Sequence, residues 1–283
     1  MATPSLLCLR GELVVVGKSP DGDSIRFIPT TPSLLARLPG GERVHLSEDG
    51  SVQLRLDAID TPETHYENHA QPLGQSARDE LLAFCGFTDV HWSGGAVVSA
   101  TPERVPAAGL ANLVDVNGRP IVLLLVGRLP RDGASTRVTP ALLARTANAA
   151  LTTSGRAYGT FYTSTAPEIV DALRTRAQAA RDARRGVWDD DASAGFELRS
   201  QASIGPAGSL ILPKLFRRCT DYLRDRMTGE TLPEWLRRHQ SGQNPEDDEV
   251  QLAGRTVRLS DLIRQDGRRI SLEADPLELL FVG

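Results

Sequence analysis

Short apolar segments separated by turn residues fill much of the first 126 residues, and this pattern constrains the fold more than any other feature. Residues 13–16 are apolar and β-branched, and residues 24–28 and 52–56 alternate polar with apolar side chains. Such alternation is typical of strands with one buried face. Asn117-Gly118 separates two further apolar runs, which is a strong hairpin signal. The first part of the chain is therefore expected to form a β-meander.

Helical spacing of apolar residues appears later, at residues 73–84, 140–154 and 167–185. Strands followed by helices favour an α+β fold around a closed or nearly closed small barrel. An acidic run of small residues follows Trp188 and is typical of a linker. We therefore expect one domain at residues 1–190 and an accessory C-terminal region of mixed α/β character at residues 191–283.

Composition limits the classes of function. The 283 residues are 40% hydrophobic and 24% charged, which is ordinary for a globular protein. The chain has 32 basic and 36 acidic residues. It therefore has no overall positive charge that would attract nucleic acid, and any site for a polyanion must be local. The apolar runs are too short for a signal peptide or a membrane span, so a cytoplasmic protein without a membrane partner is expected. Cysteines 8, 85 and 219 lie far apart and are expected to be buried, reduced thiols.

Three short clusters carry the informative polar residues. The first, Asp21-Gly22-Asp23, is by itself an ordinary hairpin turn. The second is Arg55-Leu-Asp-Ala-Ile-Asp60-Thr-Pro-Glu63-Thr, in which strand alternation places Arg55 and Asp60 on opposite faces unless a bulge intervenes. Its alternative interpretation is a helix start, with Asp60 as the cap and Glu63 as its capping-box partner. The third, Asn117-Gly118-Arg119, is by itself a hairpin turn followed by a solvated arginine.

Together, in this order and within a barrel-like strand pattern, the three clusters resemble the staphylococcal-nuclease-like (thermonuclease) family. The resemblance also includes the helix after the Pro-Glu-Thr motif, the segment 148–162 and the ending Arg-Gly-Val-Trp at residues 185–188. It spans about residues 11–188. The Asp-Thr-Pro-Glu-Thr string with its upstream arginine is its most specific part.

The resemblance implies a five-stranded OB-type β-barrel with flanking helices that hydrolyses phosphodiester bonds of DNA, RNA or both as an endonuclease. It implies Ca²⁺ as the cofactor, held by Asp23, Asp60 and the backbone carbonyl of Thr61. The family's glutamate matches Glu63, and its two phosphate-binding arginines match Arg55 and Arg119. Its aromatic contacts to the substrate base match Phe161 and Tyr162 best, with simple packing of these rings as the alternative.

The chemistry of a phosphodiester explains these residue types. Ca²⁺ takes carboxylate and carbonyl oxygens and polarises a phosphoryl oxygen, which suits Asp23 and Asp60. Two guanidiniums bind non-bridging oxygens in fork geometry and stabilise the charge of the transition state. Glu63 is suited to orient or deprotonate the attacking water, and the sequence leaves these two roles open.

Two other functions stay open. A catalytically silent nucleic-acid or protein-binding barrel would keep the appearance of the site without turnover. In the other, the accessory region acts as a docking element or regulatory lid. Its arginines at positions 217, 218, 224 and 226 are interspersed with acidic residues, which favours a solvated face with i,i+4 pairs over phosphate contacts.

Overall fold

The computed structural model describes residues 3–225, 229–239 and 246–283. Five strands close a barrel: β1 (Ser5–Val14), β2 (Ser24–Pro29), β3 (Val52–Leu56), β8 (Pro120–Val126) and β7 (Arg104–Val114). Closure follows from β1, which pairs antiparallel with both β2 and β7, while β3 and β8 pair in parallel. A short strand, β9 (Ser135–Arg137), extends the sheet beside β1. The expected α+β class and closed five-stranded barrel are confirmed.

Close approach of two strands explains a glycine in the barrel wall. A side chain on Gly11 would place its Cβ 2.1 Å from the backbone oxygen of Ile28. Because β1 pairs with β2 on one side and β7 on the other around this residue, glycine lets β1 bend across the seam. Inside lies a cluster of buried residues that includes Leu13, Phe27 and Leu54.

Two further elements contribute to this barrel cluster. Helix α1 (Gly74–Cys85) contributes its buried Leu81, and the hairpin of β5 (Thr88–Ser93) and β6 (Ala96–Thr101) contributes Val97. The segment between β2 and β3 forms two short 3-10 turns, at Pro32–Arg37 and Gly41–Arg43. The hairpin expected at Asn117-Gly118 joins β7 to β8, with Gly118 at φ 76°.

The helical segment expected at residues 140–154 is two helices, α2 (Pro140–Leu143) and α3 (Ala147–Ser154). Thr146 separates them, because its Oγ1 accepts the backbone N–H of Ala149 at 3.2 Å and caps α3. The buried Asn148 attaches α3 to the barrel through the backbone oxygen of Asp57, at 2.8 Å. Helix α4 (Pro167–Asp182) packs beside α3.

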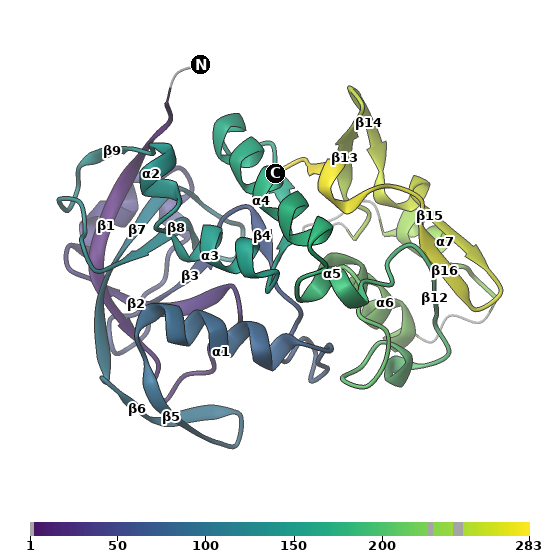
Figure 1. Cartoon of the computed structure of the whole chain (residues 1–283), viewed down its shortest axis with the longest axis horizontal. Helices are drawn as coiled ribbons and strands as arrows, with labels where there is room; N and C mark the ends of the chain where they lie inside the picture. Colours follow the sequence, from purple (N-terminus) through teal and green to yellow (C-terminus); the bar gives the residue numbers. More distant parts are fainter. Residues whose placement is uncertain (1–2, 226–228, 240–245) are drawn as a thin grey trace.

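The region beyond residue 190 adds helices and small sheets (Figure 1). Its helices are α6 (Pro213–Arg224) and α7 (Leu232–Arg238), preceded by α5 (Val187–Asp190). Its strands are β12 (Phe196–Glu197), β13 (Glu249–Leu252), β14 (Arg255–Arg258), β15 (Ile263–Asp266), β16 (Arg269–Leu272) and β17 (Leu280–Phe281). We expected α6 to run from 212 to 227, but Met227 lies outside the described residues.

This C-terminal region is joined to the barrel domain by backbone pairing and by a shared core. Strand β17 pairs in parallel with β11 (Phe161–Tyr162). One apolar cluster includes Leu110 on the barrel, Leu173 on α4, and Phe216 and Trp235 beyond residue 190. The boundary at residue 190 stays a prediction, but apolar packing continues across it.

All three cysteines are free and buried, as expected. None of the helices in the described ranges is both long enough and apolar enough to cross a lipid bilayer.

Candidate functional site

The first part of the site is the turn before β2. A side chain on Gly22 would place its Cβ 2.5 Å from Thr61 Oγ1, so glycine allows the turn to lie against the segment that comes after β3. Asp21 and Asp23 flank this glycine. The carboxylate of Asp23 accepts the backbone N–H of Thr61 at 2.9 Å, which ties the turn to the second sequence cluster.

The second part is a sharp bend between β3 and β4 (Ile59–Asp60), at Ala58 with a left-handed φ of 61°. This bend interrupts strand alternation. Arg55 therefore reaches Asp60, with Nη2 2.7 Å from Oδ1, and also pairs with Asp23 through Nη1. Strand β4 pairs with β10 (Tyr158–Gly159), which fixes Asp60 opposite Tyr158.

The third part is the loop from Glu63 to Gln71, named here the motif loop. Gln71 closes it twice, because its backbone N–H donates to the Glu63 oxygen at 2.9 Å and its side-chain oxygen accepts the Glu63 N–H at 3.1 Å. Helix α1 begins only at Gly74. The alternative in which Asp60 and Glu63 form a helix capping box is therefore wrong.

Asp21, Asp23, Asp60 and Glu63 together form the acidic cluster. A second guanidinium reaches it from α6, because Arg217 places Nη2 2.7 Å from Asp60 Oδ2 and Nη1 3.2 Å from Asp60 Oδ1. The same Nη1 also donates to Glu63 Oε1. The sequence interpretation of a solvated face is wrong for Arg217 and Arg218, whose side chains are 19% and 13% exposed, whereas Arg226 lies outside the described residues.

Helical spacing explains how α6 meets this edge of the barrel. Arg217, Asp221 and Arg224 share one face, since side chains four and three residues apart lie on the same side of a helix. Asp221 accepts the Tyr66 hydroxyl at 2.7 Å, and Arg224 lies 3.6 Å from Glu67. The three residues thus run along the segment from Asp60 to Glu67 in order. This i, i+4, i+7 spacing is the sequence signal that could have indicated the contact.

Burial and charge set the protonation of the cluster. Burial raises the pKa of Glu63 to about 7, against the opposing charge of Arg217. Burial, and after it the charge of Asp23, raises the pKa of Asp21 to about 6. Burial also acts to raise the pKa of Asp60, but the charges of Arg217 and Arg55 outweigh it and hold that pKa below its ordinary value. Asp60 is therefore the most firmly ionised acid of the three.

A divalent cation does not fit this arrangement. The donor types at Asp23 and Asp60 suit Ca²⁺, yet all four of their carboxylate oxygens already accept N–H groups from Arg55, Arg217 or Thr61. Within the described ranges, no group of three or more His, Cys, Asp or Glu side chains is arranged to hold a metal ion. One buried oxygen, Thr61 Oγ1, has no hydrogen-bond partner among the described residues.

The structure does not join Arg119 to the acidic cluster by any hydrogen bond or ion pair among the described residues. Its Nε and Nη2 both lie 2.7 Å from Asp115 Oδ2. Arg119 nevertheless comes close to Arg55 along the β3–β8 pair, because Arg55 pairs with Ile121, which is two residues after Arg119. Of the expected set, Asp23, Arg55, Asp60, Thr61 and Glu63 come together, and Arg119 is held beside them by its own hairpin.

The two aromatic residues expected to contact a base lie in β11. Phe161 is fully buried, and Arg174 Cζ lies 4.8 Å from its ring centroid. Tyr162 packs against Phe281, with ring centroids 5.8 Å apart. Phe161 is therefore packed in the core, as the alternative to a contact with a base requires, whereas Tyr162 is partly exposed.

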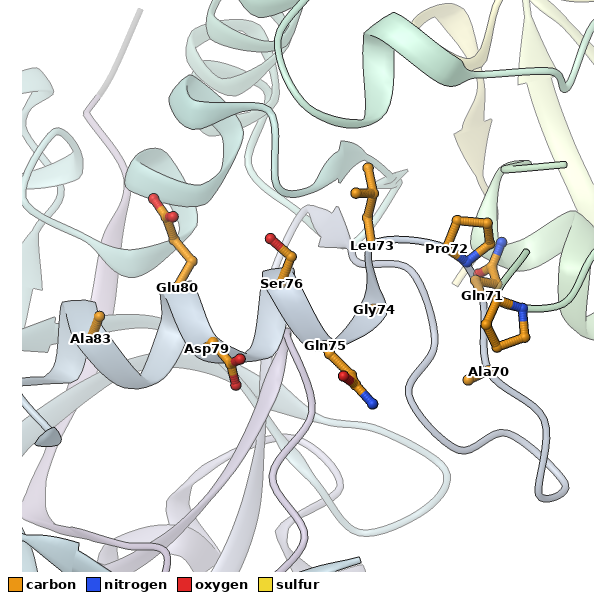
Figure 2. Close-up of a pocket in the computed structure, with 11 residues that line it drawn as sticks. Ala70, Gln71, Pro72, Leu73, Gly74, Gln75, Ser76, Asp79, Glu80 and Ala83 are labelled. Atoms are coloured by element: carbon orange, nitrogen blue, oxygen red, sulfur yellow. The ribbon is translucent and has the colours of Figure 1, made fainter. Parts of the chain in front are cut away.

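One hollow of the surface is bordered by the end of the motif loop and the start of α1 (Figure 2). It encloses about 730 Å³ and is lined by residues 70–76, by α1 residues up to Ala83 and by Pro206. Its lining includes no member of the acidic cluster and neither arginine bound to it. This hollow in the surface therefore does not mark the position of the acidic cluster.

Comparison of the sequence with models of known protein families and with curated proteins gave no match. The resemblance of residues 11–188 to the thermonuclease family therefore stays a prediction.

Proposed function

We propose that the chain is a hydrolase of DNA or RNA phosphodiester bonds, with its site at the edge of an OB-type barrel formed by the acidic cluster, Arg55 and Arg119. The observation that carries this proposal is the convergence of Asp23, Arg55, Asp60 and Glu63. These residues come from a turn, two strands and a loop. Arg55 joins Asp23 to Asp60 directly, and Arg217 links Glu63 to the same network through Asp60. The stability of the barrel does not require such a network, because burying several carboxylates together is costly.

In the proposed reaction, water attacks the phosphorus and loses a proton to the Glu63 carboxylate. A carboxyl group whose pKa is raised to about 7 suits this task, because its basicity is matched to neutral pH. The P–O bond to the leaving oxygen breaks, and that oxygen takes up a proton from solvent. Arg55 and Arg119 bind the non-bridging oxygens, for which Arg55 exchanges a contact with Asp23 or Asp60, and Arg119 exchanges Asp115, for phosphate.

Ca²⁺ dependence stays part of the proposal only through the donor chemistry of Asp23 and Asp60. Since the oxygens of both are already bonded to N–H groups in this structure, no step above is assigned to a metal ion.

A second candidate function is a catalytically silent barrel that binds nucleic acid or protein. The observation that favours it is the pairing of Arg217 with Asp60 and Glu63, because a fixed guanidinium would replace the cation and occupy the base. Removal of this guanidinium distinguishes the two candidates: the hydrolase gains activity, whereas the silent barrel stays inactive.

The direct test incubates the purified full-length protein with single- and double-stranded DNA and RNA, with Ca²⁺ or with a chelator. The hydrolase proposal expects cleavage with Ca²⁺ that is lost in Glu63→Gln. Absence of cleavage in the wild type and in Arg217→Gln, or cleavage that persists in Glu63→Gln, would contradict it.

A further inference from the structure

We infer that Arg217 is an internal counter-ion that competes with a divalent cation for Asp60, so that the C-terminal region holds the site closed until a cation displaces this one side chain. The inference rests on the proposed function for its biological meaning. The competition itself rests on the ion pairs alone.

The guanidinium occupies the oxygens that a cation needs. Ca²⁺ takes about six to eight oxygen ligands at short range, whereas Arg217 bonds both oxygens of Asp60, at 2.7 and 3.2 Å, and also Glu63. Arg55 already shares the Asp60 carboxylate with Arg217, so a divalent cation on the same oxygens would be a third positive group there, in direct contact with the Arg217 guanidinium and strongly repelled by it. A bound cation and the observed position of Arg217 are therefore mutually exclusive.

The Arg217 guanidinium is also unsuited to bind substrate where it lies. Both of its Nη atoms donate to carboxylates of the cluster, and an arginine binds phosphate in fork geometry through these same donors. The described contact therefore neutralises the cluster and withholds Glu63 from water. A role as a third phosphate ligand would require the same release.

Release requires only a side-chain movement. Helix α6 is fixed by Phe216 and Cys219, both fully buried, and by Lys214, whose Nζ lies 2.8 Å from Asp248. The motif loop is fixed to the same region, because the Gln71 amide donates to the Ile211 oxygen at 2.7 Å. Arg217 has a long flexible stem and is 19% exposed, so it can turn to solvent while α6 and the loop stay in contact.

Two features prepare the cluster for a different cation. Thr61 Oγ1 is a buried oxygen without a hydrogen-bond partner among the described residues, and it lies against the turn that carries Asp21 and Asp23. Within the part of the chain that the structure describes, the four carboxylates of the acidic cluster share two guanidiniums, Arg55 and Arg217. Removal of Arg217 leaves an excess of negative charge and takes from Asp60 Oδ2 the donor that it has here. These are conditions that favour a divalent cation.

The test measures Ca²⁺ binding by titration calorimetry on the full-length wild type, Arg217→Gln and Arg224→Gln. Arg224 is the matched control, because it lies two turns along the same face of α6 and is 54% exposed. We expect Arg217→Gln to bind Ca²⁺ at least about tenfold more tightly than the wild type, equivalent to about 1.4 kcal/mol. Arg224→Gln should bind as the wild type does.

Equal Ca²⁺ affinity in Arg217→Gln and wild type, or weaker binding in the variant, would overturn the inference. If circular dichroism shows that Arg217→Gln is unfolded, Arg217→Lys takes its place, because lysine keeps the charge but loses the fork. It should bind Ca²⁺ a few-fold more tightly than the wild type, and unchanged affinity would overturn the inference.

Cleavage of single-stranded DNA, measured on the same samples, separates the two proposals. Tighter Ca²⁺ binding without cleavage in any variant supports the competition and contradicts the hydrolase. Cleavage with unchanged Ca²⁺ affinity overturns the competition and leaves the hydrolase standing.

Discussion

The barrel edge and helix α6 contribute to one site in different ways. At the barrel edge, Asp23, Arg55, Asp60 and Glu63 all belong to one short stretch of the sequence, and turns and strand pairing bring them together. Arg217 lies 154 positions beyond Glu63, and only tertiary packing brings it there. The edge supplies groups for chemistry, whereas α6 supplies a cation that neutralises them.

A complete set of the residues that the resemblance names therefore does not by itself make an open site. The barrel edge keeps every residue that the resemblance requires, yet the Asp23 and Asp60 oxygens are bonded within the chain. If α6 closes a hydrolytic site, substitutions at the barrel edge abolish activity, and the substitution of Arg217 raises it.

The largest effect is expected for Glu63→Gln at the barrel edge. The amide cannot accept the proton of the attacking water, so cleavage should fall by about 10²–10⁴-fold. Kinetics on single-stranded DNA measure this, with Glu67→Gln as the control because Glu67 is 54% exposed and lies outside the acidic cluster. A variant that cleaves at the wild-type rate would remove Glu63 from the mechanism.

Arg119→Ala distinguishes the hairpin arginine from the arginine of α6. We expect cleavage to fall by about 10²–10³-fold, as for loss of one donor to a transition-state oxygen. Ca²⁺ affinity should stay at the wild-type value, because Asp115 rather than the cluster binds Arg119. If Arg119→Ala cleaves normally, the hairpin arginine is structural.

Core substitutions ask whether the two regions fold as one unit. Phe27 in the barrel and Phe216 in α6 are both fully buried. Replacement of either by alanine should lower the free energy of unfolding by about 3–5 kcal/mol, measured by denaturant titration. Both variants should unfold in one transition, because the cluster that contains Phe216 also contains barrel residues such as Leu110, on strand β7, which also contributes to the barrel cluster of Phe27. A separate early transition in Phe216→Ala alone would show an independent C-terminal domain.

The smallest difference is expected between two buried thiols, Cys85 of α1 and Cys219 of α6, which are 2% and 0% exposed. Burial raises the pKa of both thiols, so labelling at about pH 8 requires local opening. The labelling rates of the two thiols should differ by less than about tenfold, which corresponds to a difference of about 1.4 kcal/mol in the free energy of opening. Labelling with mass-spectrometric readout measures this. Much faster reaction of Cys219 would indicate that α6 opens while the barrel stays closed.

The sequence predicted the features that depend on local patterns. Alternation and the Asn117-Gly118 turn indicated the barrel strands, and the motif located Arg55, Asp60 and Glu63. It did not predict the left-handed Ala58, which turns Arg55 toward Asp60 against simple alternation. Nor did it place Arg217: the i, i+4, i+7 spacing of charged residues on α6 is consistent with the contact, but such a stripe is equally compatible with solvent and with a complementary loop.

The decisive measurement is the rate of Ca²⁺-dependent cleavage of single-stranded DNA by the wild type, Arg217→Gln and the double variant Arg217→Gln/Glu63→Gln, all at one Ca²⁺ concentration that saturates Arg217→Gln but not the wild type. We expect the single variant to cleave faster than the wild type and the double variant to be inactive. No cleavage by the single variant, or equal cleavage by both, would contradict a hydrolytic site closed by Arg217.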